Sequence, residues 1–195
     1  MNKSFMNIDV FIEGVEIDLV CLNEDLVAKS NWYNWFNDAQ VTKYMQKHYY
    51  PNTRSMQLNY YKNSIENNST KVQCGIYHKA TEMLIGTISL NSIDFINRNC
   101  ELSIIIGERK AQNLNVLVEA HKLMLRHAFE TLNLNRVYGG SVIKEIDLLF
   151  CRALGYSSEG VLKNHVFKRG QYMDVYLFGI LLTRYLELKQ SWFKK

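Results

Sequence analysis

The segment from residue 107 to 120, GERKAQNLNVLVEA, has the features of an anion-binding site. It follows the apolar run SIII and begins a long stretch with helical periodicity, so it joins a strand to a helix. The first N–H groups of a helix have no partner within it and carry the positive end of its dipole, a combination that binds phosphate. Arg109 and Lys110 add positive charge beside these groups. An ordinary strand-to-helix turn has the same local pattern, so the residues alone leave both interpretations open.

Two positions in this segment are unusual for a phosphate loop. Such loops normally carry glycine there, because glycine adopts positive φ and lets the backbone approach the ligand closely. Asn113 and Asn115 occupy these positions here. Asparagine tolerates the left-handed region better than most residues, but its side chain takes up room. We therefore expect the two asparagines to weaken phosphate binding without changing the fold.

The thiol and imidazole side chains do not form a metal-binding pattern. No CxxC pair is present, which favours reduced core thiols over a disulfide or a metal site. His121 and His127 are six residues apart, so they do not share a helix face as two metal ligands would. We predict no metal. The four cysteines are Cys21, Cys74, Cys100 and Cys151.

The elements that position these residues are visible as changes in periodicity. Thr53 is a candidate cap for a helix over 54–67, and the aromatic residues Trp32 and Trp35 lie on the face of an earlier helix over 26–38. Further helices are expected over 114–132 and 146–154. Strands are expected over 16–22, 71–78, 83–90, 99–106, 136–142, 160–167 and 172–182. This order predicts an α+β fold, an αβα sandwich around a mixed, mostly antiparallel sheet of roughly seven strands with about four helices.

Composition bounds the class of protein. The 195 residues are 47% hydrophobic and 22% charged, which is typical of one soluble domain spanning 1–195. No run reaches the roughly 18 apolar residues of a membrane span, and acids such as Asp9 and Glu13 interrupt the N-terminal segment, so we expect a cytoplasmic protein without membrane contact. The net charge of +4 is mild and unclustered, so no nucleic-acid partner is expected. The tail RYLELKQSWFKK predicts a terminal helix that docks either on the domain or on a second copy in a homodimer.

A wider pattern resembles the GCN5-related N-acetyltransferase (GNAT) family. It is carried by ELSIIIGERKAQNLNVLVEAHKLMLRHAFETLNLNRVYGGSV, then LGY and EGVLKNHVFKRGQYMDVYLFGIL, and it extends from about Glu16 to Leu182. The closing segment resembles members that acetylate amino sugars or protein N-termini. The first half, with WYNWFNDAQVTKYMQKHYYPNT, resembles members that acetylate the amine of nucleotide-linked sugars for bacterial surface glycans.

The resemblance implies a binding site for acetyl-coenzyme A. The family's loop is commonly Arg or Gln, two residues, Gly, one residue, then Gly or Ala, and KAQNLN matches it in register with both small residues replaced. The preceding strand is expected to supply main-chain hydrogen bonds to the pantetheine arm and an N–H donor for the tetrahedral oxyanion. The expected cofactor-binding residues are Ser103, Ile104, Ile105, Ile106, Arg109, Lys110, Ala111, Gln112, Asn113, Leu114 and Asn115.

The resemblance also suggests the catalytic residues. An amine attacks only when neutral, and Glu101, just before the coenzyme-binding part of the strand, is the leading candidate for the general base. A solvent-facing or structural role for Glu101 remains open. Asp94 and His48 are weaker candidates on the acceptor side, His48 in a loop that could cover an acceptor. The position of the family's tyrosine acid is occupied by Cys151, whose thiol either donates the proton or is a simple apolar replacement.

Three functions follow from these residues. The leading hypothesis is direct acetyl transfer from acetyl-coenzyme A to a primary amine, most plausibly of a nucleotide-linked amino sugar. The second is acetylation of a protein N-terminus, such as that of a ribosomal protein. The third is a GNAT fold without activity that serves as a binding or regulatory protein, suggested by the loss of the loop glycines, the tyrosine and the usual asparagine at the start of the helix near Lys144 and Glu145.

Overall fold

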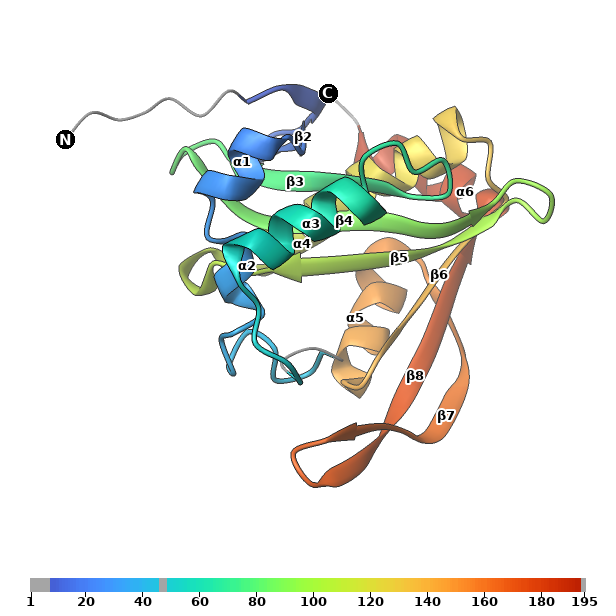
Figure 1. Cartoon of the computed structure of the whole chain (residues 1–195). Coiled ribbons are helices and arrows are strands. Elements are labelled where there is room, and N and C mark those ends of the chain that lie inside the picture. Colours follow the sequence, from blue (N-terminus) through green and yellow to red (C-terminus); the bar gives the residue numbers. More distant parts are fainter. Residues whose placement is uncertain (1–7, 46–48, 194–195) are drawn as a thin grey trace.

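A computed structural model describes residues 8–45 and 49–193 and contains one eight-stranded sheet in the order β1-β2-β3-β4-β5-β6-β8-β7 (Figure 1). All neighbours are antiparallel except β5 and β6, which run parallel. The fold class is therefore the expected α+β sandwich, with one strand more than the sequence suggested. The strands are β1 Val10–Glu13, β2 Ile17–Cys21, β3 Val72–His78, β4 Met83–Asp94, β5 Asn99–Ile106, β6 Arg136–Ser141, β7 Ser157–Lys168 and β8 Gln171–Leu181.

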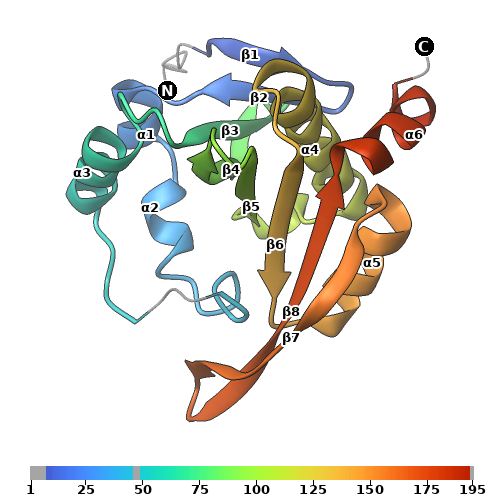
Figure 2. The ribbon, with the colours of Figure 1, turned by 90° about the vertical axis from the view of Figure 1, so that its right-hand side faces the viewer.

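Helices cover both faces of the sheet, as the two perpendicular views show (Figures 1 and 2). Three short helices lie on one face: α1 Glu24–Lys29, α2 Trp32–Trp35 and α3 Arg54–Ser64. The other face carries α4 Leu114–Arg126, which continues as a π-helical turn over His127–Thr131, and α5 Lys144–Leu154. The last helix, α6 Leu182–Trp192, follows β8.

The two faces have separate apolar cores. Under α4 and α5 the core contains Ile76, Ile88, Met124 and Phe150, together with Tyr185 of α6. The core on the α1–α3 face is smaller and is built around the buried indoles of α2. This second core fixes α1, α2 and α3 on their face of the sheet.

Local chemistry explains where the helices begin and end. Asn23 and Thr53 cap α1 and α3, because their side chains accept hydrogen bonds from Leu26 N and Met56 N. The prediction of one continuous helix over 26–38 was wrong. Ser30 adopts an extended conformation, with ψ of 169°, and separates α1 from α2. Both tryptophans, whose spacing suggested the longer helix, lie within the single turn of α2.

Beyond Glu101, β5 and β6 part to form a fork. β6 pairs with β5 only through Asn99–Arg136, Cys100–Val137 and Glu101–Tyr138. β5 continues to Ile106 with β4 on one side, whereas β6 continues with β8. One edge of β5 from Leu102 onward is therefore left without a strand partner within the described residues. Its main-chain groups are available to a ligand.

The β7–β8 hairpin extends past the sheet as a two-stranded arm (Figure 2). Its tip contacts the segment between α2 and α3. Lys168 Nζ donates to Met45 O at 2.8 Å, and Tyr49 Oη donates to Phe167 O at 3.0 Å. The arm tip is therefore tied to both Met45 and Tyr49.

The C-terminal tail forms α6 and docks on its own domain. Tyr185 is fully buried, its ring lies 5.0 Å from that of Phe129, and its hydroxyl donates to Glu130 Oε1 at 2.8 Å. Lys122 and Arg126 of α4 lie over the rings of Trp192 and Phe193. Of the two expectations for this segment, docking on the domain is the one observed.

Candidate active site

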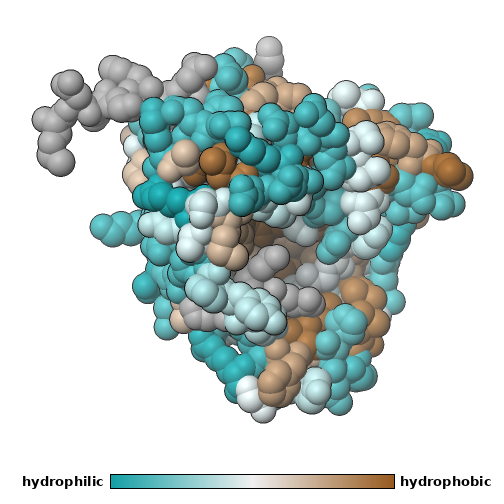
Figure 3. Space-filling view, viewed as in Figure 1, coloured by the Kyte–Doolittle hydropathy of each residue, from teal (hydrophilic) through white to brown (hydrophobic). Residues whose placement is uncertain are grey.

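A cavity of about 390 Å³ passes through the fork between β5 and β6. Met45 borders it on the α1–α3 side, and His121 and Phe150 border it on the side of α4 and α5. Glu101, Leu102, Ser103 and Ile104 of β5 form one wall, and Gly140, Ser141 and Val142 after the pairing region of β6 form another. We call this space the fork cavity. In the space-filling view, the α1–α3 face is hollowed near its middle (Figure 3).

Glu101 lies at the vertex of the fork. It belongs to the last residue pair that joins β5 to β6 and is opposite Asn91 on β4. Its side chain alternates with those of Cys100 and Leu102, which are buried on the α4–α5 side, so Glu101 lies on the α1–α3 face. Among the described residues no hydrogen bond or ion pair engages its carboxylate. The residue is half-buried and borders the fork cavity.

The loop after β5 presents its charge to solvent. Arg109–Ala111 form one 3-10 turn, and Arg109 and Lys110 are exposed. The helix α4 begins at Leu114, so the N–H groups of its first turn lie beside these two cations. The loop, the unpartnered edge of β5 and the fork cavity are contiguous along the chain. Together they place two exposed cations, the start of a helix and an open strand edge beside one cavity.

Asn113 has a role that the sequence reasoning missed. Its φ of −136° and ψ of 161° are extended, and neither Asn113 nor Asn115 has positive φ. The loop therefore does not need the conformational freedom of glycine, contrary to the explanation offered from sequence. Asn113 is the N-cap of α4, and its Oδ1 accepts from Val116 N at 2.8 Å. That bond occupies one of the amides that would otherwise face an anion.

Three further contacts hold the loop in place. Gln112 Nε2 donates to Ile106 O at 2.9 Å, which ties the loop to the end of β5. Trp35 Nε1 donates to Glu108 Oε1 at 2.8 Å, which ties it to α2. A Cβ atom at Gly107 would come within 1.9 Å of the Trp35 ring, so this position requires glycine because of close approach. The loop is thus fixed by α2 on one side and β5 on the other.

Cys151 lies on α5 and borders none of the cavities described for this site. Its Sγ donates to Asp147 Oδ1 at 3.7 Å. Burial, and then the charge of Asp147, raise the pKa of the Cys151 thiol, so the group is protonated at neutral pH. The structure gives this thiol a partner within its own helix.

The other two acceptor-side candidates do not join the site in the described residues. Asp94 is at the β4–β5 turn, where its carboxylate accepts from Ile96 N and Asn97 N at 2.8 Å each. These bonds hold the pKa of Asp94 below its usual value, with the Asn97 amides as the largest cause. His48 lies outside the described residues, so its expected role stays a prediction.

His121 is a member of the fork cavity that the sequence reasoning did not select. It is 1% exposed, its ring packs at a tilt against that of Phe150 with centroids 4.5 Å apart, and its Nδ1 lies 2.9 Å from Leu117 O. Burial lowers its pKa to about 4, so the imidazole is neutral at pH 7. Because a neutral ring that donates from Nδ1 to a carbonyl has an acceptor at Nε2, His121 adds polarity without charge. The sequence feature that could have identified His121 is its position four residues after Leu117, which places it on the apolar face of the helix.

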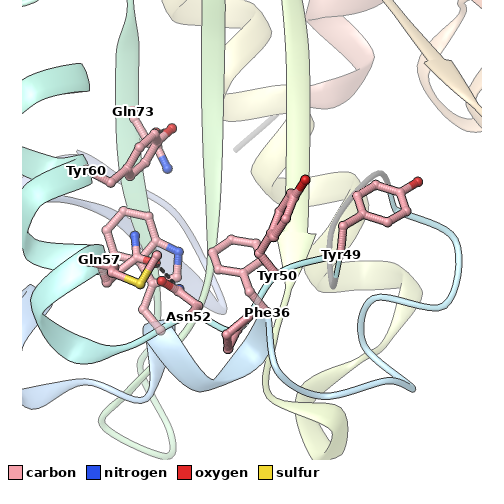
Figure 4. A pocket seen from close by; sticks show the side chains of 10 residues that line it. Phe36, Tyr49, Tyr50, Asn52, Gln57, Tyr60 and Gln73 are labelled. Atoms are coloured by element: carbon pink, nitrogen blue, oxygen red, sulfur yellow. Dashed lines mark hydrogen bonds between the residues drawn. The ribbon is translucent and has the colours of Figure 1, made fainter.

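Two more cavities continue from the fork cavity over the α1–α3 face. A polar cavity of about 240 Å³ shares Met45, Ser103 and Ile104 with it. An aromatic pocket of about 390 Å³ in turn shares Phe36, Tyr60 and Gln73 with the polar cavity. Figure 4 shows the aromatic pocket, bordered by α2, α3 and residues 49–52. Shared lining residues therefore link the three cavities in a series between Glu101 and α3.

Comparisons with known proteins identify the family. A model described as the acetyltransferase (GNAT) domain matches residues 23–144. The uncharacterized N-acetyltransferase p20 of Bacillus licheniformis is 28% identical over 155 residues, which cover 77% of this chain and 85% of that protein. A spermidine N(1)-acetyltransferase of Vibrio cholerae is 25% identical over 155 residues, covering 79% and 87%. This chain belongs to the GNAT family of acetyltransferases.

A solved structure agrees with this assignment at the level of the fold. The crystal structure of spermidine N-acetyltransferase from Vibrio cholerae in complex with CoA and spermine superposes with a TM-score of 0.77 at 24% identity, covering 88% of this chain and 98% of that one. As a member of the family the chain is an N-acetyltransferase, and acetyl-coenzyme A is its acetyl donor. The cationic loop, the open edge of β5 and the fork cavity fit that donor.

The described residues contain no helix long and apolar enough to cross a membrane. They also contain no cluster of three or more histidine, cysteine or acidic residues placed to hold a metal ion.

Proposed function

We propose that this enzyme acetylates the primary amine of a small, neutral or anionic acceptor, and that a nucleotide-linked amino sugar is the class of acceptor it takes. The observation that carries the proposal is the charge around the three cavities. Among the described residues that border them, Glu101 is the one carboxylate and Lys71 is the one cation. An acceptor with a single amine needs no more negative charge than Glu101 provides.

The same charges argue against a polyamine. A relative in Vibrio cholerae is a spermidine N(1)-acetyltransferase, and spermidine carries several positive charges at neutral pH. Recognition of such a cation requires complementary negative charge along its length. The polar cavity instead contains Lys71, and its other polar groups are neutral, among them Gln73, Ser89 and Asn91. Similarity to the spermidine enzyme therefore supports the reaction and the donor but not its acceptor.

Glu101 is positioned to act as the general base. The protonated acceptor nitrogen gives one proton to the Glu101 carboxylate, directly or through a water molecule, and the lone pair of the neutral amine then attacks the thioester carbonyl. The nitrogen loses its second proton to water as the amide forms. Main-chain N–H groups on the open edge of β5 donate to the oxyanion of the tetrahedral intermediate. When the carbon–sulfur bond breaks, the thiolate of coenzyme A leaves. Because Cys151 is hydrogen-bonded to Asp147 and lies outside the cavities, we propose that water protonates this thiolate.

The remaining expected contacts are assigned to the donor. We propose that Arg109, Lys110 and the first amides of α4 bind the pyrophosphate, and that β5 from Ser103 to Ile106 binds the pantetheine arm. Exposure of the loop and the extended conformation of Asn113 support this assignment. A purely regulatory role is less well supported, because the loop keeps its cations and does not require the glycines it lacks.

Release of free thiol from acetyl-coenzyme A tests the proposal. The enzyme is offered nucleotide-linked amino sugars, spermidine and peptides with free N-termini. We expect turnover with the first group and little with the other two. Turnover with spermidine alone would refute the acceptor class, and preference for peptides would establish N-terminal acetylation instead.

A pair of matched variants tests the base. Glu101→Gln should lower turnover by about 10²–10⁴-fold, the range for loss of a general base, with little change in affinity for acetyl-coenzyme A. Glu13→Gln makes the same chemical change on the exposed edge strand β1 and should leave turnover unchanged. Equal turnover in the two variants would show that Glu101 is not the base.

A further inference from the structure

Lys71 places a cation without a counter-ion in the polar cavity. The residue is half-buried immediately before β3, and its Nζ donates to Tyr60 Oη at 2.8 Å. Tyr60 Oη donates onward to Gln73 Oε1 at 3.3 Å, and Figure 4 shows these two side chains together at one side of the aromatic pocket. Among the described residues Lys71 forms no ion pair, whereas Arg136 on β6 is bonded to Glu159. An ammonium group has three donors, so two N–H bonds of Lys71 remain for an anion that the described chain does not supply.

The register of the sheet fixes the position of this cation relative to Glu101. Val72 of β3 is opposite Leu90 of β4, so Lys71 lies opposite Asn91, and Asn91 is opposite Glu101 of β5. The three residues therefore form one row across the sheet. Neighbouring strands are about 4.8 Å apart, which puts the backbones of Lys71 and Glu101 roughly 10 Å apart. A ligand about the size of one sugar ring spans the space between their side chains.

The side chains between these two charges are neutral. Asn91 Nδ2 donates to Ser89 Oγ at 3.1 Å and to Ser103 Oγ at 3.3 Å, and all three residues border the polar cavity. Within the described part of the chain, the two cavities thus have a carboxylate at one end of the row and an ammonium group at the other. A ligand with an amine at Glu101 and a second cation would meet like charge at Lys71. Like charges repel more strongly where water is partly excluded, so this site opposes such a ligand.

We propose that Lys71 selects the acceptor by charge. Its ammonium group binds a phosphate or carboxylate of the acceptor while the acceptor amine lies at Glu101, and it excludes acceptors that carry a second amine in the same place. The ligand class is therefore a monoamine with an acid group about one sugar ring away from the amine. This inference rests on the proposed function and assigns the residue that recognises the charge of its acceptor. Because Lys71 binds and does not transfer a proton, its replacement should change KM for the acceptor much more than kcat.

Three amines with one hexyl chain separate charge from shape in the thiol-release assay: aminohexanoate, hexylamine and diaminohexane. The parent enzyme should have the highest kcat/KM with aminohexanoate and the lowest with diaminohexane, at least about tenfold apart, as for a hydrogen bond between charged groups. Lys71→Gln should abolish this order, Lys71→Glu should reverse it, and Lys71→Arg should keep it. Lys29→Glu makes the same change of charge on α1, outside the three cavities, and should leave the order of the parent unchanged.

Calorimetry tests the same site without turnover. Enzyme saturated with coenzyme A should bind glucosamine-6-phosphate at least about tenfold more tightly than glucosamine, and Lys71→Gln should bind the two equally. A larger effect of Lys71→Gln in this pair than between aminohexanoate and hexylamine assigns a phosphate, and the reverse assigns a carboxylate. If Lys71→Gln has a lowered melting temperature, Lys71→Met, which keeps the apolar stem, takes its place.

The outcomes separate this inference from the proposed function. A parent enzyme without preference for the anionic ligands, or a Lys71→Gln variant that keeps the preference, would refute selection by Lys71. If Lys71 controls the preference but nucleotide-linked amino sugars give no thiol release, the proposed acceptor fails and the role of Lys71 stands.

Discussion

Replacing Asn113 by glycine should improve binding of the acetyl donor. The side chain of Asn113 accepts from Val116 N at 2.8 Å and so competes with phosphate for an amide at the positive end of α4. Glycine removes this competitor and leaves the extended backbone at this position unstrained. A hydrogen bond from that amide to a charged oxygen contributes about 1.5 kcal/mol, which corresponds to roughly a tenfold lower Kd.

The cost to folding should be small. Glycine is itself an acceptable N-cap, and replacing asparagine by glycine there lowers stability by only a few tenths of a kcal/mol, roughly. The melting temperature of Asn113→Gly should therefore stay close to that of the parent. Asn113→Ala releases the same amide but should cost about 1 kcal/mol, because alanine is a poor cap.

Calorimetry with coenzyme A measures the change in affinity. Two variants serve as controls, one at the neighbouring asparagine and one that changes the charge of the cap. Asn115→Gly should leave the affinity nearly unchanged, because no hydrogen bond of the Asn115 side chain is formed within residues 8–45 and 49–193. Asn113→Asp keeps a capping oxygen and adds negative charge, so it should weaken binding. If Asn113→Gly binds coenzyme A no more tightly than the parent, the amide of Val116 does not contact the phosphates and the competition argument is wrong.

Three more variants probe other parts of the site. Gly107→Ala should lower the free energy of unfolding by about 1–3 kcal/mol in urea titrations, because the added methyl group meets the buried Trp35 ring; an unchanged midpoint would contradict this contact. The pKa of His121 is about 4 in the folded protein and 6.5 for a free imidazole, so the unfolded chain takes up the proton first as the pH falls. The contribution of His121 to the free energy of unfolding is therefore fully present above pH 6.5 and falls by about 3 kcal/mol by pH 4. In His121→Gln the free energy of unfolding, measured by denaturation at several pH values, should depend less on pH. The same pH dependence in the variant and the parent would contradict this role for His121. Cys151→Ala should retain turnover in the thiol-release assay, whereas a loss near 100-fold would make this thiol the acid.

The sequence was most informative where a residue's role depends on its neighbours in the chain. The strand over 99–106 was predicted with the limits of β5, because a run of β-branched residues follows a polar loop and ends at a glycine. The helix after Asn113 was also predicted at its first residue, although its cap was interpreted as a crowding side chain. Short-range periodicity explains these successes.

Features that depend on distant contacts could not be predicted in this way. The strand β1 has four residues that are mostly exposed at a sheet edge, so it has no apolar alternation to detect. The need for glycine at Gly107 comes from Trp35, which belongs to a different element. The aromatic pocket likewise joins residues from α2, α3 and β3, and only the fold brings Trp32 and Gln57 together. Charge around a cavity is also a property of the assembled chain.

The contacts between the arm tip and the acceptor side have a kinetic consequence. Lys168 donates a hydrogen bond to Met45 O, and Phe167 O accepts one from Tyr49. Met45 borders both the fork cavity and the polar cavity. Widening the entrance therefore displaces two segments at once, and one of them is a long hairpin that must move through solvent. We expect entry of the amine and departure of its acetylated product to require this motion. When acetyl transfer is faster than this motion, steady-state turnover should slow in viscous solvents such as concentrated sucrose. A variant with a shorter hairpin should show a weaker dependence of turnover on viscosity.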